Sequence, residues 1–312
     1  MSGVRRRLVV ALLGVVASSM FIFAVLRVLP GDVATARLGI DATPEALAEL
    51  RREYGLERPV VVQYVDWISD FSRGSLGTSL VDGTDVGGAI VSRLDVTIPL
   101  VVSSSVVSIV AALWIGRRAA LRRRSVSGVV AGLLSQLGLA IPTFVLGIAL
   151  VALFAVRWQL LPAGGFPVDG WRNTFEALRS MVLPVLTLSL TQVAMLVRFS
   201  RSESLDYIAS SAFRTARSVG RTTGRAMSGA LRLILSPVLT VGALQLSTLL
   251  TGAVVVESVF ALPGLGSMMV RDIANRDLTK VQSTLLVLVL TVFIIRLVVD
   301  FVNDRLDPRR LA

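Results

Sequence analysis

Long apolar runs separated by shorter polar connections dominate the chain. The hydrocarbon core of a bilayer is about 30 Å thick, so a helix needs about 20 apolar residues to cross it. Runs of that kind cover residues 8–29, about 97–116, 126–156, 181–200, 233–257 and 281–302. We therefore predict an all-α fold, that of a polytopic membrane protein with six transmembrane helices.

The third apolar run is longer than one straight span requires. Its 31 residues would extend about 46 Å as a single helix, well beyond the hydrocarbon core. Pro142 lies near its middle, and proline kinks or breaks a helix because it lacks the backbone N–H and clashes with the preceding turn. This segment is therefore predicted to be kinked, strongly tilted or divided into two pieces.

Basic residues gather in alternate connections, and this pattern predicts how the chain is oriented. Arginines close to the ends of spans mark the cytoplasmic side of membrane proteins. Here they lie near both termini and in the connections around 117–125 and 198–232. With six spans, all four places fall on one side, so both termini are predicted to be cytoplasmic. The connections 31–96, 157–180 and 258–280 then fall on the outer side.

The long outer connection contains a strong helix start. Thr43 can cap a helix with its hydroxyl, Pro44 suits the first helical position, and Glu45 places an acid in the first turn. Leu47, Leu50 and Tyr54 would then share one face, and Gly55 can end the helix. We predict a short amphipathic helix on the outer surface, which either packs against the bundle or contacts a ligand directly.

Composition narrows the possible functions. Hydrophobic residues make up 54% of the chain, and the arginines behind its net charge of +11 lie mostly in the short connections. There they set topology, so the charge does not indicate nucleic acid. The chain has no histidine and no cysteine, which excludes the usual zinc sites and both Ser/His/Asp and Cys/His catalysis. Lys280, the only lysine, follows Thr279 and precedes Val281, so the chain lacks the Gly-Lys-Ser/Thr of an ATP-binding P-loop.

The connection from 201 to 232 is much longer than two antiparallel helices need for a turn. Four of its arginines recur at spacings of three and four, namely Arg214, Arg217, Arg221 and Arg225. On a helix they would form one basic face, and Gly220 would allow a bend or the close approach of another backbone. Two interpretations stay open: the arginines bind anionic lipid headgroups, or the helix docks on a cytoplasmic partner.

Several ordered motifs, spread over nearly the whole chain, resemble those of a known family. They are Val28-Leu29-Pro30-Gly31-Asp32, Thr43-Pro44-Glu45, Tyr54-Gly55-Leu56, Ala140-Ile141-Pro142, Phe213-Arg214-Thr215-Ala216-Arg217-Ser218-Val219-Gly220, Ser236-Pro237, Glu257-Ser258-Val259-Phe260, Pro263-Gly264-Leu265-Gly266, Arg276-Asp277, Val281-Gln282 and Leu306-Asp307-Pro308. On these motifs the chain resembles the inner-membrane permease subunits of binding-protein-dependent ATP importers (ABC importers), in particular the dipeptide and oligopeptide branch.

The resemblance implies a transporter subunit of the prokaryotic cytoplasmic membrane that is not itself an enzyme. It implies an N-terminal transmembrane helix over 1–30, an extracytoplasmic segment over 31–96, a type-1 transmembrane domain over 97–302 and a cytoplasmic tail over 303–312. The implied partners are a second, homologous permease, two ATPase subunits or domains, and an extracytoplasmic substrate-binding protein. ATP and Mg would be bound by the ATPases, so no catalytic, cofactor-binding or metal-binding residue is expected in this chain.

Two groups of residues are expected to carry the function. By resemblance, the inner loop couples to an ATPase through Arg214, Thr215, Ala216, Arg217 and Gly220. A second group, Glu257, Pro263, Gly264 and Gly266, is expected to form an outer turn or gate, with Glu257 in a solvated position.

Three classes of function remain as alternatives to a peptide importer. A related importer for nickel, haem or glutathione could use a similar chain. An ion-coupled secondary transporter would need ionisable groups at the bilayer midplane or duplicated broken helices, neither of which is evident. An intramembrane enzyme is the weakest alternative, because no pair of aspartates lies in two different spans.

Overall fold

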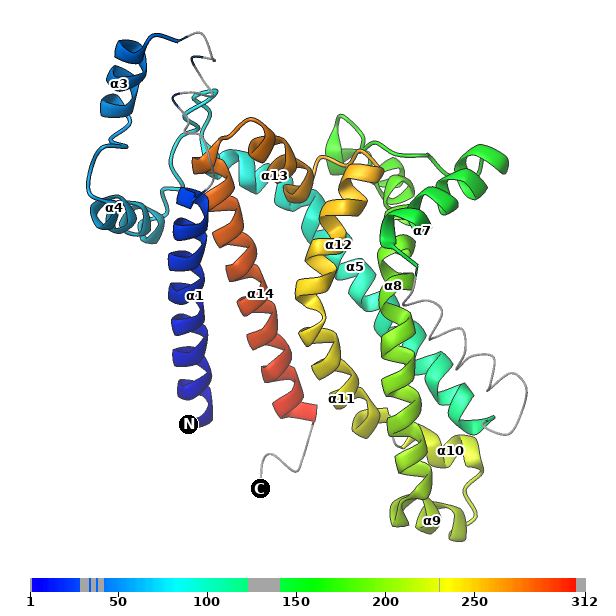
Figure 1. Ribbon diagram of the computed structural model, residues 1–312. Coiled ribbons are helices and arrows are strands. Elements are labelled where there is room, and N and C mark those ends of the chain that lie inside the picture. The colour runs from blue at the N-terminus through cyan, green and yellow to red at the C-terminus, as the bar shows by residue number, and fades with distance from the viewer. Residues whose placement is uncertain are drawn as a thin grey trace. The chain divides into compact units, whose positions relative to one another are not determined.

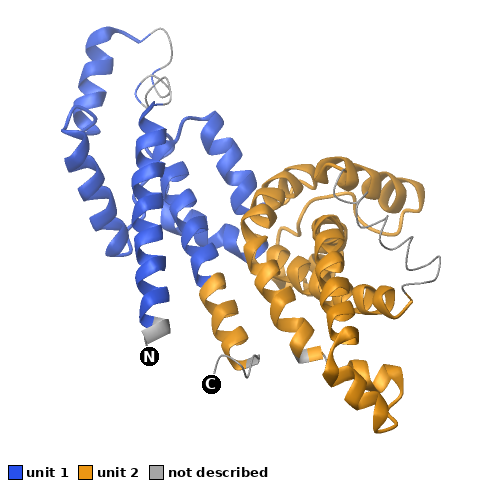
Figure 2. Ribbon diagram, turned by 60° about the horizontal axis from the view of Figure 1, so that its bottom comes forward, with its two compact units in different colours: residues 1–96, 263–294 blue, residues 97–262, 295–312 orange. Residues whose placement is uncertain are grey.

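A computed structural model describes residues 2–28, 34, 38, 42–122, 141–229 and 231–306. The elements of these residues are helices joined by turns and loops, and their one isolated β-bridge joins Thr78 and Asp85. The chain forms two compact units (Figure 2). Unit 1 comprises residues 1–96 and 263–294, and unit 2 comprises residues 97–262 and 295–312.

Four helices of the described chain are long and apolar enough to cross a membrane. They are α1 (Ser2–Val28), α5 (Val86–Leu121), α8 (Thr174–Ala209) and α14 (Leu278–Leu306) (Figure 1). A fifth candidate is the pair α11 (Leu231–Leu244) and α12 (Leu246–Val259), which are bent by 55° at their junction. The described residues therefore support a polytopic protein with four or five spans and leave the predicted number of six unconfirmed.

The predicted third span is only partly described. Residues 126–140 lie outside the described residues, as do 307–312 of the predicted tail. The remainder forms α7 (Thr143–Leu150), which begins directly after Pro142, and a π-helix, η1 (Val151–Arg157). Proline at the entry to a helix costs no hydrogen bond, because the first N–H groups of a helix have no partner within it.

Two spans extend beyond their predicted ends. α5 begins at Val86 instead of 97, because the Asp85 carboxylate accepts a hydrogen bond from the Gly88 N–H at 2.6 Å and starts the helix there. α8 continues to Ala209 instead of 200 and so carries its last turns through polar sequence. The extracytoplasmic segment predicted to end at 96 therefore includes the first residues of α5.

The short helix predicted after Thr43 is confirmed in unit 1 as α3 (Pro44–Glu53). The Thr43 hydroxyl accepts from the Ala46 N–H at 3.3 Å, and Pro44 occupies the first helical position. Gly55, with φ +64°, ends the helix as expected. Two further helices of unit 1 were not predicted, α4 (Val60–Ser72) and α13 (Leu265–Ala274).

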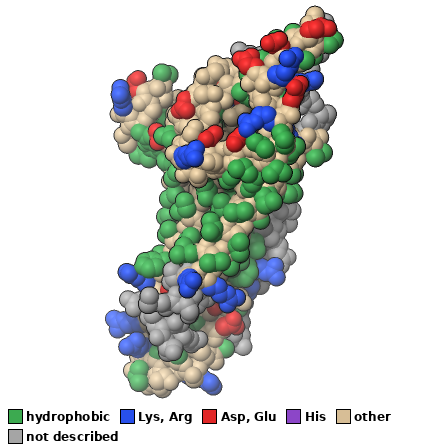
Figure 3. All heavy atoms as spheres, turned by 90° about the vertical axis from the view of Figure 1, so that its left-hand side faces the viewer, with side chains coloured by type: hydrophobic (Ala, Val, Ile, Leu, Met, Phe, Trp, Pro, Cys, Tyr) green, Lys and Arg blue, Asp and Glu red, His purple; other side chains and the backbone are tan. Residues whose placement is uncertain are grey.

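Unit 1 is held together by two apolar clusters. Ile22 and Leu26 of α1 pack against Val281 of α14, so these helices lie side by side (Figure 1). Val86 and Ile90 at the start of α5 pack against α13. The opposite side of α1 is open: hydrophobic side chains form a broad band on the face drawn in Figure 3, and Leu12, Leu13 and Phe21 are more than 60% exposed. Such a surface suits lipid.

In unit 2, α5 and α8 approach closely through small residues. The Ser108 hydroxyl donates to the Ser189 carbonyl oxygen at 3.2 Å, and the Ser189 hydroxyl donates to the Ser104 carbonyl oxygen at 3.3 Å. A Cβ on Gly116 would lie 2.7 Å from the Ser200 side chain. Small residues and interhelical hydroxyl bonds are typical of helix contacts in membranes, where apolar burial alone gives little preference for protein over lipid.

Candidate functional site

The predicted coupling loop begins where α8 ends. Ser210 has an extended backbone (φ −71°, ψ 158°), and its hydroxyl accepts a hydrogen bond from the Phe213 N–H at 3.3 Å. The same hydroxyl donates to the Tyr207 carbonyl oxygen at 2.7 Å. Because a serine in this position caps a new helix, the chain turns directly from α8 into α9 (Ser211–Ser218).

Gly220 ends α9 in a Schellman motif. Its φ is +82°, its N–H bonds the Arg217 carbonyl oxygen at 3.1 Å, and the Arg221 N–H bonds the Ala216 carbonyl oxygen at 3.2 Å. The bend expected at Gly220 is therefore present. No atom of the described chain lies within 4 Å of where a Cβ would be, so the glycine serves the backbone conformation and leaves open space above it.

The expectation of one basic helical face is wrong. After the Gly220 bend, Thr222 caps a second helix, α10 (Thr223–Ser228), by accepting a hydrogen bond from the Arg225 N–H at 3.4 Å. Arg214 and Arg217 therefore lie on α9, Arg221 lies in the turn, and Arg225 lies on α10. A glycine with positive φ followed by a capping threonine interrupts the helix that the arginine spacing indicated.

One side of the loop packs against the helix bundle of unit 2. Met227 on α10 is fully buried in a cluster of apolar residues from α5, α8 and α11. The Tyr207 hydroxyl donates to the Ala226 carbonyl oxygen at 3.3 Å, and its ring meets the Phe213 ring edge-on at 5.8 Å. Figure 1 shows α9 and α10 at the lower end of α8. The loop thus has a rigid base.

The predicted coupling residues lie on the side of the loop that faces away from the helix bundle. Arg214, Thr215, Arg217 and Gly220 are exposed, and Ala216 is half-buried. Val219, which the sequence did not single out, is 69% exposed beside them. A surface with two arginines and one protruding valine on a rigid base can bind a partner surface that is acidic and partly apolar.

Glu257, expected to be solvated at an outer turn, is fully buried in unit 2. Its carboxylate accepts a hydrogen bond of 2.6 Å from the hydroxyl of Thr97 on α5. The expectation was wrong because α12 continues past the carboxylate to Val259 and turns this side chain toward a neighbouring helix. A buried carboxylate that accepts a hydrogen bond is held in one orientation, whereas a hydrated carboxylate at the surface is not.

The turn that follows α12 is strained at one residue. The Ala261 N–H bonds the Ser258 carbonyl oxygen at 3.4 Å, and the Leu262 N–H bonds the Glu257 carbonyl oxygen at 2.8 Å, which completes another Schellman motif. Here the left-handed position is held by Ala261, with φ +50°, where glycine is usual. A left-handed residue with a Cβ costs about 1 kcal/mol.

An Ala261→Gly substitution is therefore expected to stabilise the protein by about 0.5–1 kcal/mol, because it relieves this strain. The measurement is the apparent Tm of the purified protein in detergent, which should rise. Gly220→Ala, which introduces the same strain into the α9 motif, should lower it. If both substitutions shifted Tm in the same direction, the interpretation of the two turns would fail.

Pro263, Gly264 and Gly266 belong to unit 1 and begin a helix where a turn was expected. Gly264 (φ −98°, ψ 179°) is the residue before α13, and Gly266 is buried in the first turn of that helix. The Pro263 carbonyl oxygen accepts a hydrogen bond from Arg93 at 3.5 Å. Glu257 lies in the other compact unit, so these four residues do not form one site within either unit.

Sequence reasoning missed a charged cluster in unit 1. The Lys280 ammonium lies 2.6 Å from the Asp82 carboxylate and 3.7 Å from that of Asp277, and its side chain is only 8% exposed. The Asp277 carboxylate caps α14 by accepting from the Lys280 N–H at 3.3 Å, and it also accepts from the Ser79 hydroxyl. This cluster ties the chain before α5 to the start of α14.

The environment of this cluster shifts two carboxyl groups in opposite directions. The hydrogen bond from Lys280 holds the pKa of Asp82 well below its usual range. Asp272 on α13 has its pKa raised, chiefly because burial disfavours the charged form. One of its oxygens is buried with no hydrogen-bond partner in the described chain. Asp82 therefore remains ionised at neutral pH, and the stabilisation it gives is lost only as the pH falls through its lowered pKa.

Two family models match the chain over most of its length. Residues 106–311 match the family described as "Binding-protein-dependent transport system inner membrane component", and residues 2–101 match its N-terminal companion, "Binding-prot-dependent transport system membrane comp, N-term". The first match includes the α9–α10 loop, and the second includes α3 and α4.

Relatives align with the chain over nearly its whole length. A Brucella suis protein named as a peptide transport system permease is 38% identical over 288 residues, which cover 92% of this chain and 91% of that protein. A Sinorhizobium fredii protein named as a peptide ABC transporter permease is 32% identical and covers 97% of each chain. The glutathione transport system permease protein GsiC of Salmonella choleraesuis is 33% identical, over 93% of this chain and 92% of that protein. With family matches over both parts of the sequence and relatives of this identity along its length, the chain belongs to the family of inner membrane components of binding-protein-dependent transport systems.

Proposed function

We propose that this chain is one of two pore-forming permease subunits of an ATP-driven importer that moves di- or oligopeptides across the cytoplasmic membrane. Alternating access in the pore would be driven by ATP hydrolysis in partner ATPases, which bind ATP and Mg. An extracytoplasmic binding protein would deliver the substrate. Family membership and the peptide permeases among the relatives support this proposal.

The topology proposed for this function has six spans with both termini in the cytoplasm. The N-terminal helix, the outer segment to residue 96, the transmembrane domain over 97–302 and the tail over 303–312 would form its parts. The positive-inside pattern supports this orientation. In this orientation α9 and α10 would lie on the cytoplasmic side, with the ATPases, and α3 would lie on the outer side, with the binding protein.

The observation that carries the proposal is the α9–α10 loop. Met227 and Tyr207 fix the loop to the helix bundle. The opposite side of the loop exposes Arg214, Thr215, Arg217 and Val219. A rigid base is what a mechanical coupling needs, because movement of a docked partner is then transmitted to α8 and α11. ATP binding would shift the population between two pore conformations through this contact. Arg214, Thr215, Ala216, Arg217 and Gly220 are the proposed coupling residues.

The test is reconstitution with and without partners. In liposomes that contain the chain, the second permease, the ATPases and the binding protein, uptake of labelled peptide is expected to require ATP. Liposomes that lack only the ATPases should show no uptake above the protein-free background. Uptake without ATPases would contradict the proposal and favour an ion-coupled secondary transporter, which needs no such partner.

A second candidate substrate rests on the similarity to the glutathione permease GsiC. The substrate is best identified through the binding protein, which selects it. Di- and oligopeptides presented by that protein should stimulate ATP hydrolysis by the complex, whereas stimulation by glutathione alone would favour the second candidate. Pro263, Gly264 and Gly266 in unit 1 remain proposed as part of the outer gate, and Glu257 is proposed separately as a gate residue of unit 2.

A further inference from the structure

α4 in unit 1 has three chemically different faces. Its residues recur at spacings of three and four, so each set below lies along one side of the helix. The aromatic face consists of Tyr64, Trp67 and Phe71, the aliphatic face of Val61, Val65 and Ile68, and the polar face of Gln63, Asp66 and Asp70. A helix with two apolar faces and one polar face requires two apolar neighbours.

The aromatic face packs on α1. The Tyr64 hydroxyl lies 2.9 Å from the Ser19 hydroxyl, within hydrogen-bonding distance. The Phe23 ring meets the Tyr64 ring edge-on at 5.4 Å and stacks on the Trp67 ring at 6.1 Å. Such pairs add stability beyond the area they bury. α4 is therefore attached to α1 at the level of Ser19 and Phe23.

These contacts place α4 at hydrocarbon depth. Apart from Ser18 and Ser19, α1 is apolar from Leu8 to Leu26, a length of about 27 Å at 1.5 Å per residue, close to that of the hydrocarbon core, and Arg27 follows. Phe23 lies about 5 Å and Ser19 about 10 Å inside the end of this stretch at Leu26, which is the depth of an interfacial helix. The helix that packs against them is thus in the leaflet at the C-terminal end of α1.

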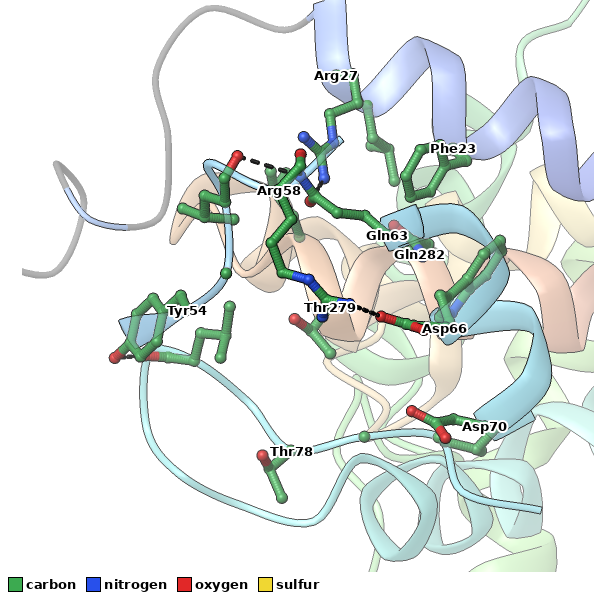
Figure 4. Close-up of a pocket in the computed structure, with 18 of the residues that line it drawn as sticks. Phe23, Arg27, Tyr54, Arg58, Gln63, Asp66, Asp70, Thr78, Thr279 and Gln282 are labelled. Carbon is green, nitrogen blue, oxygen red and sulfur yellow. Dashed lines mark hydrogen bonds and ion pairs between the residues drawn. The ribbon is translucent and has the colours of Figure 1, made fainter. Parts of the chain in front are cut away.

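The polar face of α4 points into a pocket of about 610 Å³ (Figure 4). Asp66 pairs with Arg58 at 2.8 Å, and the Gln63 amide donates to the Arg58 carbonyl oxygen at 2.7 Å. Asp70 also lines this pocket. The charged side chains of α4 therefore have an aqueous or ion-paired environment on a side away from its aliphatic face.

Two of the three residues on the aliphatic face, Val61 and Val65, are open in the described chain, and Ile68 is half-buried. Val61 is 72% exposed and Val65 is 52% exposed. α1, to which α4 is attached, carries its own exposed apolar surface through Met20 and Phe21 at the same depth. Valine side chains at this depth are favoured in lipid and disfavoured in water.

We propose that α4 is an interfacial helix whose aliphatic face contacts the acyl chains of the leaflet at the C-terminal end of α1. In the topology proposed above, this is the outer leaflet. Each face of α4 then has a matching environment: the aromatic face packs on α1, the aliphatic face contacts lipid, and the polar face lines the pocket. The outer segment would be anchored in the membrane through α4 and would not project freely from it. This inference does not depend on the substrate or on ATP coupling.

Spin-label accessibility tests the proposal in the reconstituted complex. The chain has no cysteine, so V61C, V65C and D70C each give it one labelling site. The complex with the unsubstituted chain is the control for labelling of cysteines in the partner chains. Labels at 61 and 65 should collide often with oxygen, which concentrates in lipid, and rarely with a water-soluble nickel chelate. The oxygen-to-nickel ratio is expected to be several-fold higher there than for D70C, the matched control on the polar face.

Two results would overturn the proposal. Nickel accessibility at 61 and 65 equal to that at 70 would place the aliphatic face in water. Low accessibility to both reagents at 61 and 65 would mean that another protein subunit covers this face. Because V61C and V65C are small changes at exposed positions, ATP-driven uptake should remain and verify that the labelled complex is intact.

Discussion

A Gly220→Glu substitution is expected to abolish ATP-driven uptake while the chain still inserts into the membrane. The side chain would project from the α9 turn into the open space beside Val219, where the proposed partner docks. A bulky acid at the centre of an interface costs about 2 kcal/mol or more, which corresponds to about a thirtyfold loss in affinity. ATP hydrolysis that is stimulated by the loaded binding protein should fall accordingly.

Gly220→Ala is the matched control for this prediction. Both substitutions place a Cβ at φ +82° and so have the same backbone cost of about 1 kcal/mol, but alanine adds neither bulk nor charge. Uptake with Gly220→Ala should therefore stay close to normal. Equal activity of the two variants, with equal amounts in the membrane, would remove the docking role of the loop.

Lys280→Met is expected to produce the largest loss of stability. It leaves the buried Asp277 carboxylate (side chain 2% exposed) without its cation and Asp82 without its closest partner. Removal of one member of a buried ion pair costs about 3 kcal/mol or more. The apparent Tm of the purified protein should fall, and proteolysis of the connection that carries Asp82 should become faster.

The double substitution Asp277→Asn with Lys280→Met tests the cause of that loss. Asparagine can still accept from Ser79 and cap α14, but it carries no charge. The double variant should therefore regain part of the lost Tm. If Lys280→Met alone left Tm unchanged, or if the double variant were no more stable than the single one, the cluster would not hold unit 1 as described.

Local signals in the sequence were sufficient for several elements. The α3 start at Thr43 and Pro44 and its end at Gly55 follow from capping and backbone rules that act within a few residues. At Gly220 the sequence predicts a bend or a close backbone approach, and the structure has the bend. The α9–α10 division was not predicted, because the spacing of four arginines indicates one helix, whereas Gly220 followed by the capping Thr222 divides it.

Contacts between residues far apart in the sequence explain the other differences between prediction and structure. Lys280 and Asp82 are 198 residues apart, and without structure nothing connects them. The burial of Glu257 depends on Thr97 of another helix. Apolar length also predicts only the part of a helix that lies in lipid, so the extensions of α5 and α8 through polar sequence were missed.

Cross-linking of the α9 turn tests the central claim most directly. In the reconstituted complex, T215C carries a cross-linker on the proposed docking surface, and V168C, at a fully exposed position in the connection between η1 and α8, serves as the control. If α9 docks on an ATPase, T215C should cross-link to that subunit with a yield that changes when ATP is added, and V168C should not. Reaction of T215C with lipid alone, or equal ATPase cross-linking at both positions, would contradict the coupling role.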